Sequence, residues 1–243
     1  MKWIGALAIA ALIAGSCTEK KKELVSDTPA AAQATQAAAI TPPSAEGLPA
    51  GDYKLDPAHS TLIFSVSHLG FSNYTGQFSK FSAEMKLDPA NPSTASLTAT
   101  IDPTSLIQPA PPAGFREEIL GKDWIDAIQF PAITFRSTAV TRQSENVAEV
   151  TGNLNLHGVS KPITLEMTFN GGYVGHQFEP NARVGFSAHG TFKRSDFGIA
   201  NGIPGPGSNM GVSDEVKVMI EAEFTGPPWK DAPSPAPATP PAN

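Results

Sequence analysis

The sequence predicts an all-β domain of about eight antiparallel strands with one short helical insertion. Along most of the central chain apolar and polar residues alternate, as they do in strands that bury one face. Turn-forming pairs such as Asp88-Pro89 and Gly171-Gly172 separate these segments, which favours hairpins over crossover helices. Such strands form either a sandwich or a closed barrel, and a closed antiparallel β-barrel has the advantage of leaving no exposed edge.

The predicted strands follow one another along the domain. They cover residues 62–67, 77–87, 133–140, 150–157, 163–169, 184–192 and 216–224. In the second of them the apolar positions change parity between Phe78 and Phe81. A β-bulge near Ser79 or Lys80 would return both side chains to one face of the sheet.

One segment has helical spacing instead. Phe115, Ile119 and Leu120 share one stripe, which predicts a helix over residues 115–127. The loop after this helix leads into the strand at 133–140. A single helix in a barrel is expected across one end or along one flank.

The composition excludes several functional classes. Of 243 residues, 17 are Lys or Arg and 23 are Asp or Glu, which gives a formal net charge of −6. Nucleic acid is therefore not an expected partner, because phosphate contacts require clustered cations. A single Cys excludes an intramolecular disulfide framework and every metal site built from several Cys residues.

The N-terminal residues have the pattern of a signal for export. After a basic start, the apolar run from Trp3 to Ala14 would be about 18 Å long as a helix, against about 30 Å for the membrane core. This run is too short to span, and it predicts a signal peptide over residues 1–16. The residues that end in Cys17 resemble a bacterial lipobox, which implies a lipidated Cys17 anchored in a membrane of the bacterial cell envelope and facing the periplasm. The alternative is an ordinary signal peptide followed by an incidental Cys.

Two flanking segments have the composition of unpacked chain. Residues 17–50 are rich in Ala, Gln, Thr and Pro, so they bury too little apolar surface to offset the entropy of ordering. We expect a lipidated, disordered tether there and a disordered tail over the Pro-rich residues 227–243. The folded domain is then expected over residues 51–226.

The sequence displays no catalytic or metal-binding motif, so we expect no catalysis, and a metal only at a site that distant strands would assemble. The run from Gly185 to His189 departs from the nucleophile elbow G-x-S-x-G at its last position and lies in a strand pattern. The five His residues include no closely spaced ligand pair. His68 could hydrogen-bond a ligand headgroup, and Arg183 and Arg194 could contact a phosphate or quinone oxygen. The alternative roles are a turn histidine and solvated cations.

Two interpretations of the domain interior follow from the residues. Gly152, Ala188 and Gly190 at inward positions would leave space, and side chains such as Phe64 and Phe186 would surround it. A barrel of this size is either filled by its own side chains or holds one small ligand. The residues alone favour the packed interior.

A series of short motifs resembles the YceI-like polyisoprenoid-binding family. The motifs are Asp56-Pro57-Ala58-His59-Ser60, Phe64 to Gly70, Gly76-Gln77-Phe78, Phe130 to Phe135, Gly152 to Val159 with Lys161-Pro162, Phe192 to Gly198, and Val212 to Val216. They occur in the family's order and cover nearly all of residues 51–226.

The resemblance implies a lipocalin-like antiparallel barrel whose apolar interior holds a long isoprenoid lipid, of quinone or prenyl phosphate type, for transport or storage. It implies no catalysis and no cofactor beyond this ligand. The expected lining residues are Phe64, Val66, Phe78, Phe135, Gly152, Leu154, Leu165, Met167, Phe186, Ala188, Phe192, Val218 and Ile220. His68, Arg183 and Arg194 are the headgroup candidates.

The expected partners are this lipid and, through the anchor, a membrane, and a dimer is compatible with the sequence. Two other functions compete with lipid binding: an enzyme acting on an envelope lipid, and a structural or partner-binding envelope module. A long, closed apolar tunnel would favour binding, whereas a polar cleft with converging titratable groups would favour catalysis. A large exposed apolar patch would favour the partner-binding module.

Overall fold

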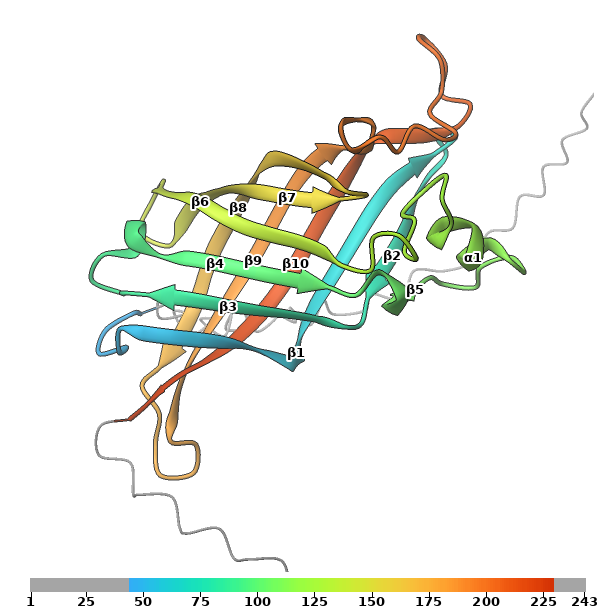
Figure 1. The fold of residues 1–243 in the computed structure, drawn as a ribbon. Coiled ribbons are helices and arrows are strands. Elements are labelled where there is room, and N and C mark those ends of the chain that lie inside the picture. The colour runs from blue at the N-terminus through green and yellow to red at the C-terminus, as the bar shows by residue number, and fades with distance from the viewer. Residues whose placement is uncertain (1–43, 230–243) are drawn as a thin grey trace, which may run out of the picture. The chain divides into compact units, whose positions relative to one another are not determined.

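Eight antiparallel strands close into a barrel in the computed structural model of this protein, which describes residues 44–229 (Figure 1). The closed ring runs in the order β1 (Gly51–His68), β3 (Phe81–Leu87), β4 (Ser96–Ile101), β6 (Ile133–Arg142), β7 (Val147–Leu156), β8 (Val159–Tyr173), β9 (Asn181–Lys193) and β10 (Val212–Pro228). Pairing of β10 with β1 completes the ring, which confirms the predicted antiparallel barrel. The predicted signal peptide, Cys17 and most of the predicted tether and tail lie outside the described residues.

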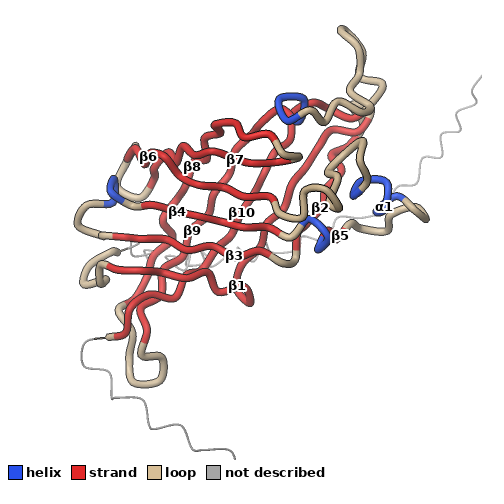
Figure 2. Tube along the Cα trace, viewed as in Figure 1, coloured by secondary structure: helices blue, strands red, loops and turns tan. Residues whose placement is uncertain are grey.

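Two short strands extend one end of the ring. β2 (Ser72–Phe78) pairs with the part of β1 from Leu62 to His68, whereas β3 pairs with the first four residues of β1. β5 (Leu106–Ile107) pairs with β2. The short 3-10 helices η1 (Pro92–Thr94), η2 (Pro103–Ser105) and η3 (Arg194–Phe197) lie in connections between strands, as Figure 2 shows.

The strand predicted over residues 77–87 is interrupted at Ser79 and Lys80 instead of bulged. β2 ends at Phe78 and β3 begins at Phe81. The amides of Ser79 and Lys80 donate to the carbonyl and hydroxyl oxygens of Ser105, at 3.2 and 3.0 Å, and so leave the sheet ladder. Phe78 and Phe81 nevertheless both face the barrel interior. The parity change therefore marks a break between two strands.

The helix predicted over residues 115–127 forms only in its first half. α1 (Phe115–Leu120) ends because Gly121 adopts an extended conformation, with φ −78° and ψ 175°. The chain then continues in turns, in which the Ala127 amide donates to the Leu120 carbonyl at 2.9 Å. Among the helices of the described chain, none combines the length and the apolar character that a membrane span requires.

The packed structure extends slightly beyond residues 51–226, so the predicted boundaries are too narrow. Leu48 is buried in a cluster with Tyr53 and Val184. At the other end, β10 continues to Pro228, and the Trp229 amide donates to a backbone carbonyl at 2.6 Å. The last residues of the predicted tether and the first of the predicted tail thus belong to the folded domain.

Candidate ligand-binding cavity

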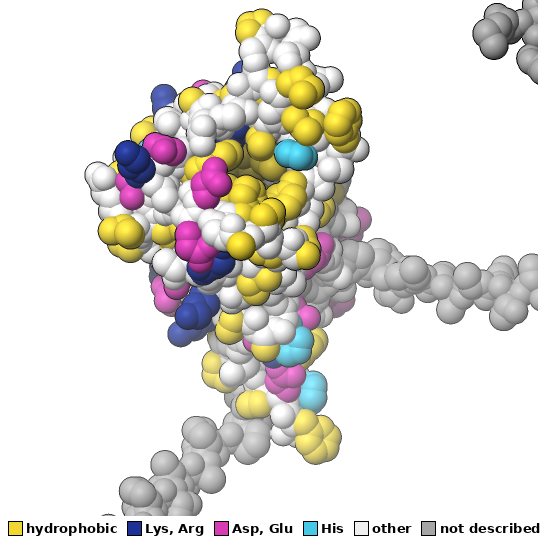
Figure 3. All heavy atoms as spheres, turned by 90° about the vertical axis from the view of Figure 1, so that its right-hand side faces the viewer, with side chains coloured by type: hydrophobic (Ala, Val, Ile, Leu, Met, Phe, Trp, Pro, Cys, Tyr) yellow, Lys and Arg dark blue, Asp and Glu magenta, His cyan; other side chains and the backbone are white. Residues whose placement is uncertain are grey.

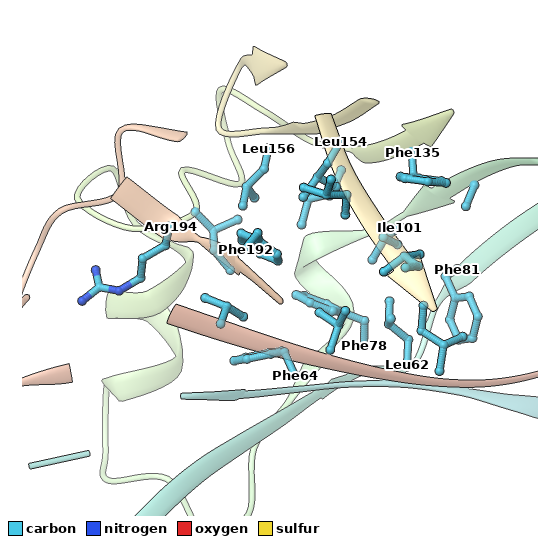
Figure 4. A pocket seen from close by; sticks show the side chains of 18 of the residues that line it. Leu62, Phe64, Phe78, Phe81, Ile101, Phe135, Leu154, Leu156, Phe192 and Arg194 are labelled. Atoms are coloured by element: carbon cyan, nitrogen blue, oxygen red, sulfur yellow. The ribbon is translucent and has the colours of Figure 1, made fainter. Parts of the chain in front are cut away.

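The barrel encloses a cavity of about 450 Å³, a volume within the range of small-molecule sites. Figure 4 shows Leu62 and Phe64 of β1, Phe78 of β2, Phe135 of β6 and Leu154 of β7 reaching into this space. Residues of the helical insertion complete the wall. The alternation of apolar and polar residues along the strands therefore makes the barrel interior apolar.

Almost all of the predicted lining residues lie on this wall. They are Phe64, Val66, Phe78, Phe135, Leu154, Leu165, Met167, Phe186, Ala188, Phe192, Val218 and Ile220. Each occupies the inward position that the alternation of its strand assigns. The interior is consequently a cavity, and the packed interior that the residues alone favour is wrong.

Gly152 is the exception, because neighbouring side chains already fill the space beside it. A Cβ atom at Gly152 would stand 2.3 Å from Cζ of the Phe135 ring. At Gly190 a Cβ atom would stand 2.7 Å from Cδ2 of Leu165. Neither glycine borders the cavity, whereas Ala188 does. The prediction that Gly152 lines a ligand site is therefore wrong.

One end of the cavity is apolar and closed. Leu55, Ala83 and Phe224 line the cavity there. Tyr53 and Val184 are 1% and 0% exposed and fill the barrel behind them. The Tyr53 hydroxyl donates to a backbone carbonyl at 2.7 Å and offers nothing to a ligand.

The opposite end holds the polar side chains of the cavity wall. In the described chain these are His68, Tyr74, Gln108, Trp124 and Arg194. Strand pairing brings His68 and Tyr74 to this end, since the end of β1 lies between the first residues of β2 and of β10. Figure 3 looks onto this end and shows a hollow lined by hydrophobic side chains, with a histidine beside it. We call this opening the mouth.

Arg194 borders the mouth, but its guanidinium is bonded to the backbone. Its N–H groups donate, at 2.7 to 3.1 Å, to the carbonyl oxygens of Ile199, Asn201, Val212 and Ser213. The guanidinium lies 5.0 Å from the centre of the Trp124 ring and points away from the apolar side chains in Figure 4. Burial lowers the pKa of Arg194. Arg194 thus fastens the segment 199–213 to the barrel, and little of its hydrogen-bonding capacity remains for a headgroup.

Arg183 does not line the cavity, which corrects its prediction as a headgroup contact. Its Nη1 donates to carboxylate oxygens of Asp56 and Glu223, both at 2.7 Å, and its Nη2 donates to Glu179 at 2.7 Å. The hydrogen bond from Arg183, and then that from His59, hold the pKa of the Asp56 carboxyl well below its usual range. Arg183 therefore belongs to an ion-pair cluster outside the cavity.

The same cluster contains potential metal ligands. Ligand atoms of Asp56, His59 and Glu223 lie within 4.8 Å of one another. The Arg183 guanidinium already supplies the positive charge between the two carboxylates. This geometry favours an ion-pair network over a metal site.

His68 stands at the mouth, as its position at a strand end suggests. It is the last residue of β1 and pairs with Ser72 of β2 and Val212 of β10. Its side chain is exposed and borders the cavity. Of the three headgroup candidates, His68 is therefore the one that borders the cavity without its side chain being hydrogen-bonded to other residues of the described chain.

Three residues of the cavity wall, Tyr74, Gln108 and Trp124, are not among the predicted site residues. Alternation within β2 does indicate Tyr74, which shares the inward parity of Phe78. Trp124 continues the helical stripe of Leu120 by one turn. Gln108 begins a Pro-rich loop, and no periodicity indicates where its side chain points.

Known proteins share this architecture. A model of the YceI-like domain family matches residues 53–224. A UPF0312 protein of Pseudomonas fluorescens is 37% identical over 167 residues, which cover 68% of this chain and 84% of that protein. The crystal structure of Burkholderia cenocepacia BcnA matches with a TM-score of 0.59 at 28% identity, over 70% of this chain and 98% of BcnA.

A more distant structure shares the fold. The polyisoprenoid binding domain from Saccharophagus degradans matches with a TM-score of 0.52 at 16% identity, over 72% of this chain and 98% of that domain. The family match spans the barrel from β1 to β10, and the relative from Pseudomonas covers more than two thirds of the chain. On these grounds the chain belongs to the family of YceI-like domains.

Proposed function

We propose that the protein binds one long-chain isoprenoid lipid, of quinone or prenyl phosphate type, inside the barrel for transport or storage. The cavity carries this proposal, because its wall is apolar along the barrel and polar only at the mouth. A lipid with a long tail and one polar head fits in one orientation, with its tail toward the closed end. The Saccharophagus polyisoprenoid binding domain has the same fold, which supports an isoprenoid as the tail.

We propose further that the protein acts by binding, without catalysis. Apart from His68 and Tyr74 at the mouth, the described residues that line the cavity include no group typical of acid–base or nucleophilic catalysis: no Asp, Glu, Lys, Cys, Ser or Thr. Acid–base and nucleophilic catalysis use such groups, placed within reach of the reacting atoms. The wall therefore supports a binding protein better than an enzyme that acts on a lipid.

The bound lipid can be identified directly. We expect an organic extract of the Cys17→Ser protein, purified without detergent, to contain a prenyl lipid by mass spectrometry. The apolar cavity should retain this lipid through purification because release exposes its tail to water. An extract containing only straight-chain acyl lipids would contradict the isoprenoid class, and an extract without lipid would contradict the proposal.

We also propose that the chain is exported and held in the bacterial envelope, on the periplasmic side, by a lipidated Cys17. The short apolar run, the small residues after it and the single Cys support this location. We expect cells given a labelled fatty acid to incorporate it into the wild-type chain and into the matched control Ser16→Ala, but not into Cys17→Ser. Absence of label from the wild-type chain would show an ordinary signal peptide instead.

A further inference from the structure

Three buried polar side-chain atoms in the described chain have no hydrogen-bond partner, and all three belong to residues of the cavity wall. They are the Tyr74 hydroxyl, Oε1 of Gln108 and Nε1 of Trp124. Gln108 is only 8% exposed. An unpaired buried polar atom destabilises a folded protein, so native structures contain few of them. Three on one cavity wall indicate groups that await a ligand.

The fold brings these three residues to the mouth. Tyr74 pairs with Val66 near the end of β1. Gln108 follows β5, and because β5 is antiparallel to β2, the chain leaves it toward the Tyr74 end of β2. Trp124 lies beneath the Arg194 guanidinium at the end of β9. A head placed at the mouth therefore meets all three side chains while its tail extends into the barrel.

The three groups are uncharged. The Trp124 indole donates, the Tyr74 hydroxyl donates or accepts, and the Gln108 amide oxygen accepts. Arg194 is the one permanent cation of the described wall, and its N–H groups are largely taken by backbone carbonyls. A buried phosphate would lack a compensating charge here, and burying an uncompensated charge is strongly unfavourable.

We propose that Tyr74, Gln108 and Trp124 form a head-group site that selects an uncharged head with a carbonyl or hydroxyl oxygen over a phosphate. This inference rests on the proposed function, because it assumes that the tail of the ligand occupies the barrel. It narrows the class of the ligand head at the mouth, where the polar side chains of the described cavity wall lie.

The test compares four ligands with the same geranylgeranyl chain: the alcohol, a quinone, the phosphate and the hydrocarbon without a head. Affinities are measured on the full-length Cys17→Ser protein by displacement of a fluorescent prenyl probe. We expect the alcohol and the quinone to bind about ten-fold more tightly than the hydrocarbon, as one or two hydrogen bonds provide. The phosphate should bind no more tightly than the hydrocarbon.

Single substitutions assign this preference to the three residues. Tyr74→Phe, Gln108→Leu and Trp124→Phe each remove one unpaired atom and keep an apolar side chain in its place. Each should reduce the preference for the alcohol over the hydrocarbon by about two- to three-fold, without weakening hydrocarbon binding. Tyr173→Phe is the matched control, since Tyr173 is exposed and lies outside the cavity.

A second measurement separates binding from folding. The melting temperature of the ligand-free protein should stay unchanged or rise in Tyr74→Phe, because an unpaired buried hydroxyl is removed. Equal affinity for the four ligands, tightest binding of the phosphate, or an unchanged head preference in all three variants would overturn the head-group site. Each of these outcomes leaves the proposed function standing, whereas failure of every ligand to bind would overturn the proposed function itself.

Discussion

Affinity for prenyl alcohols is expected to rise by at least about ten-fold for each added isoprene unit until the chain fills the barrel, and then to level off. Burial of one five-carbon unit contributes up to about 4 kcal/mol, at roughly 0.8 kcal/mol per carbon. Association itself costs about 4 to 15 kcal/mol, so a single unit yields little net affinity. Chain length must therefore supply the binding free energy.

A variant that narrows the cavity should shorten the prenyl chain at which affinity stops rising. Ala188 is a small inward residue that borders the cavity, and Ala188→Leu extends a side chain into the space of the tail. We expect its affinity to level off at a shorter chain than in the wild type, while Ala139→Leu on the exposed face of β6 behaves like the wild type. Affinity that does not depend on chain length in the wild type would refute tail binding in the barrel.

Loss of the Arg194 guanidinium is expected to lower the free energy of unfolding by about 3 to 5 kcal/mol. Arg194→Met keeps the apolar stem of the side chain but removes the donors to four backbone carbonyls between Ile199 and Ser213. Carbonyls left without donors in a buried site are costly, and the segment 199–213 loses its hydrogen bonds to the Arg194 side chain. Urea denaturation of the full-length Cys17→Ser protein measures this effect.

The neighbouring residue provides the control for this experiment. Lys193 is an exposed cation next to Arg194 in sequence. We expect Lys193→Met to change the free energy of unfolding by no more than about 0.5 kcal/mol. If both substitutions have the same small effect, Arg194 does not hold the segment in the way that its hydrogen bonds indicate.

Alternation in the sequence was sufficient to predict an antiparallel all-β domain and the inward side chains of its strands, because successive side chains of a strand face opposite sides. Closure into a barrel around a ligand came from the resemblance to the YceI-like family. The same parity separates the two arginines: Arg194 continues the inward positions of Phe186 and Phe192, whereas Arg183 stands between the inward residues Ala182 and Val184. Both were predicted as headgroup contacts from their residue type. Their parity would have placed Arg183 outside.

The errors arise where a position depends on a partner strand. Whether a glycine leaves open space depends on the side chain opposite, and at Gly152 the ring of Phe135 fills it. Phe135 lies on β6, the strand that pairs with β7, so periodicity within β7 alone does not reveal the contact. Likewise, the unpaired atom of Gln108 lies in a loop without periodicity, so its direction follows only from the pairing of β5 with β2.

If the barrel holds a lipid as we propose, its closed end determines the order of lipid exchange. Tyr53 and Val184 block the far end within the described chain, so a lipid passes through the mouth in single file. A second lipid cannot enter until the first has withdrawn its whole tail, and the empty barrel is an obligatory intermediate of every exchange. The release rate is then independent of the concentration of the incoming lipid, because the first lipid leaves before the second one binds.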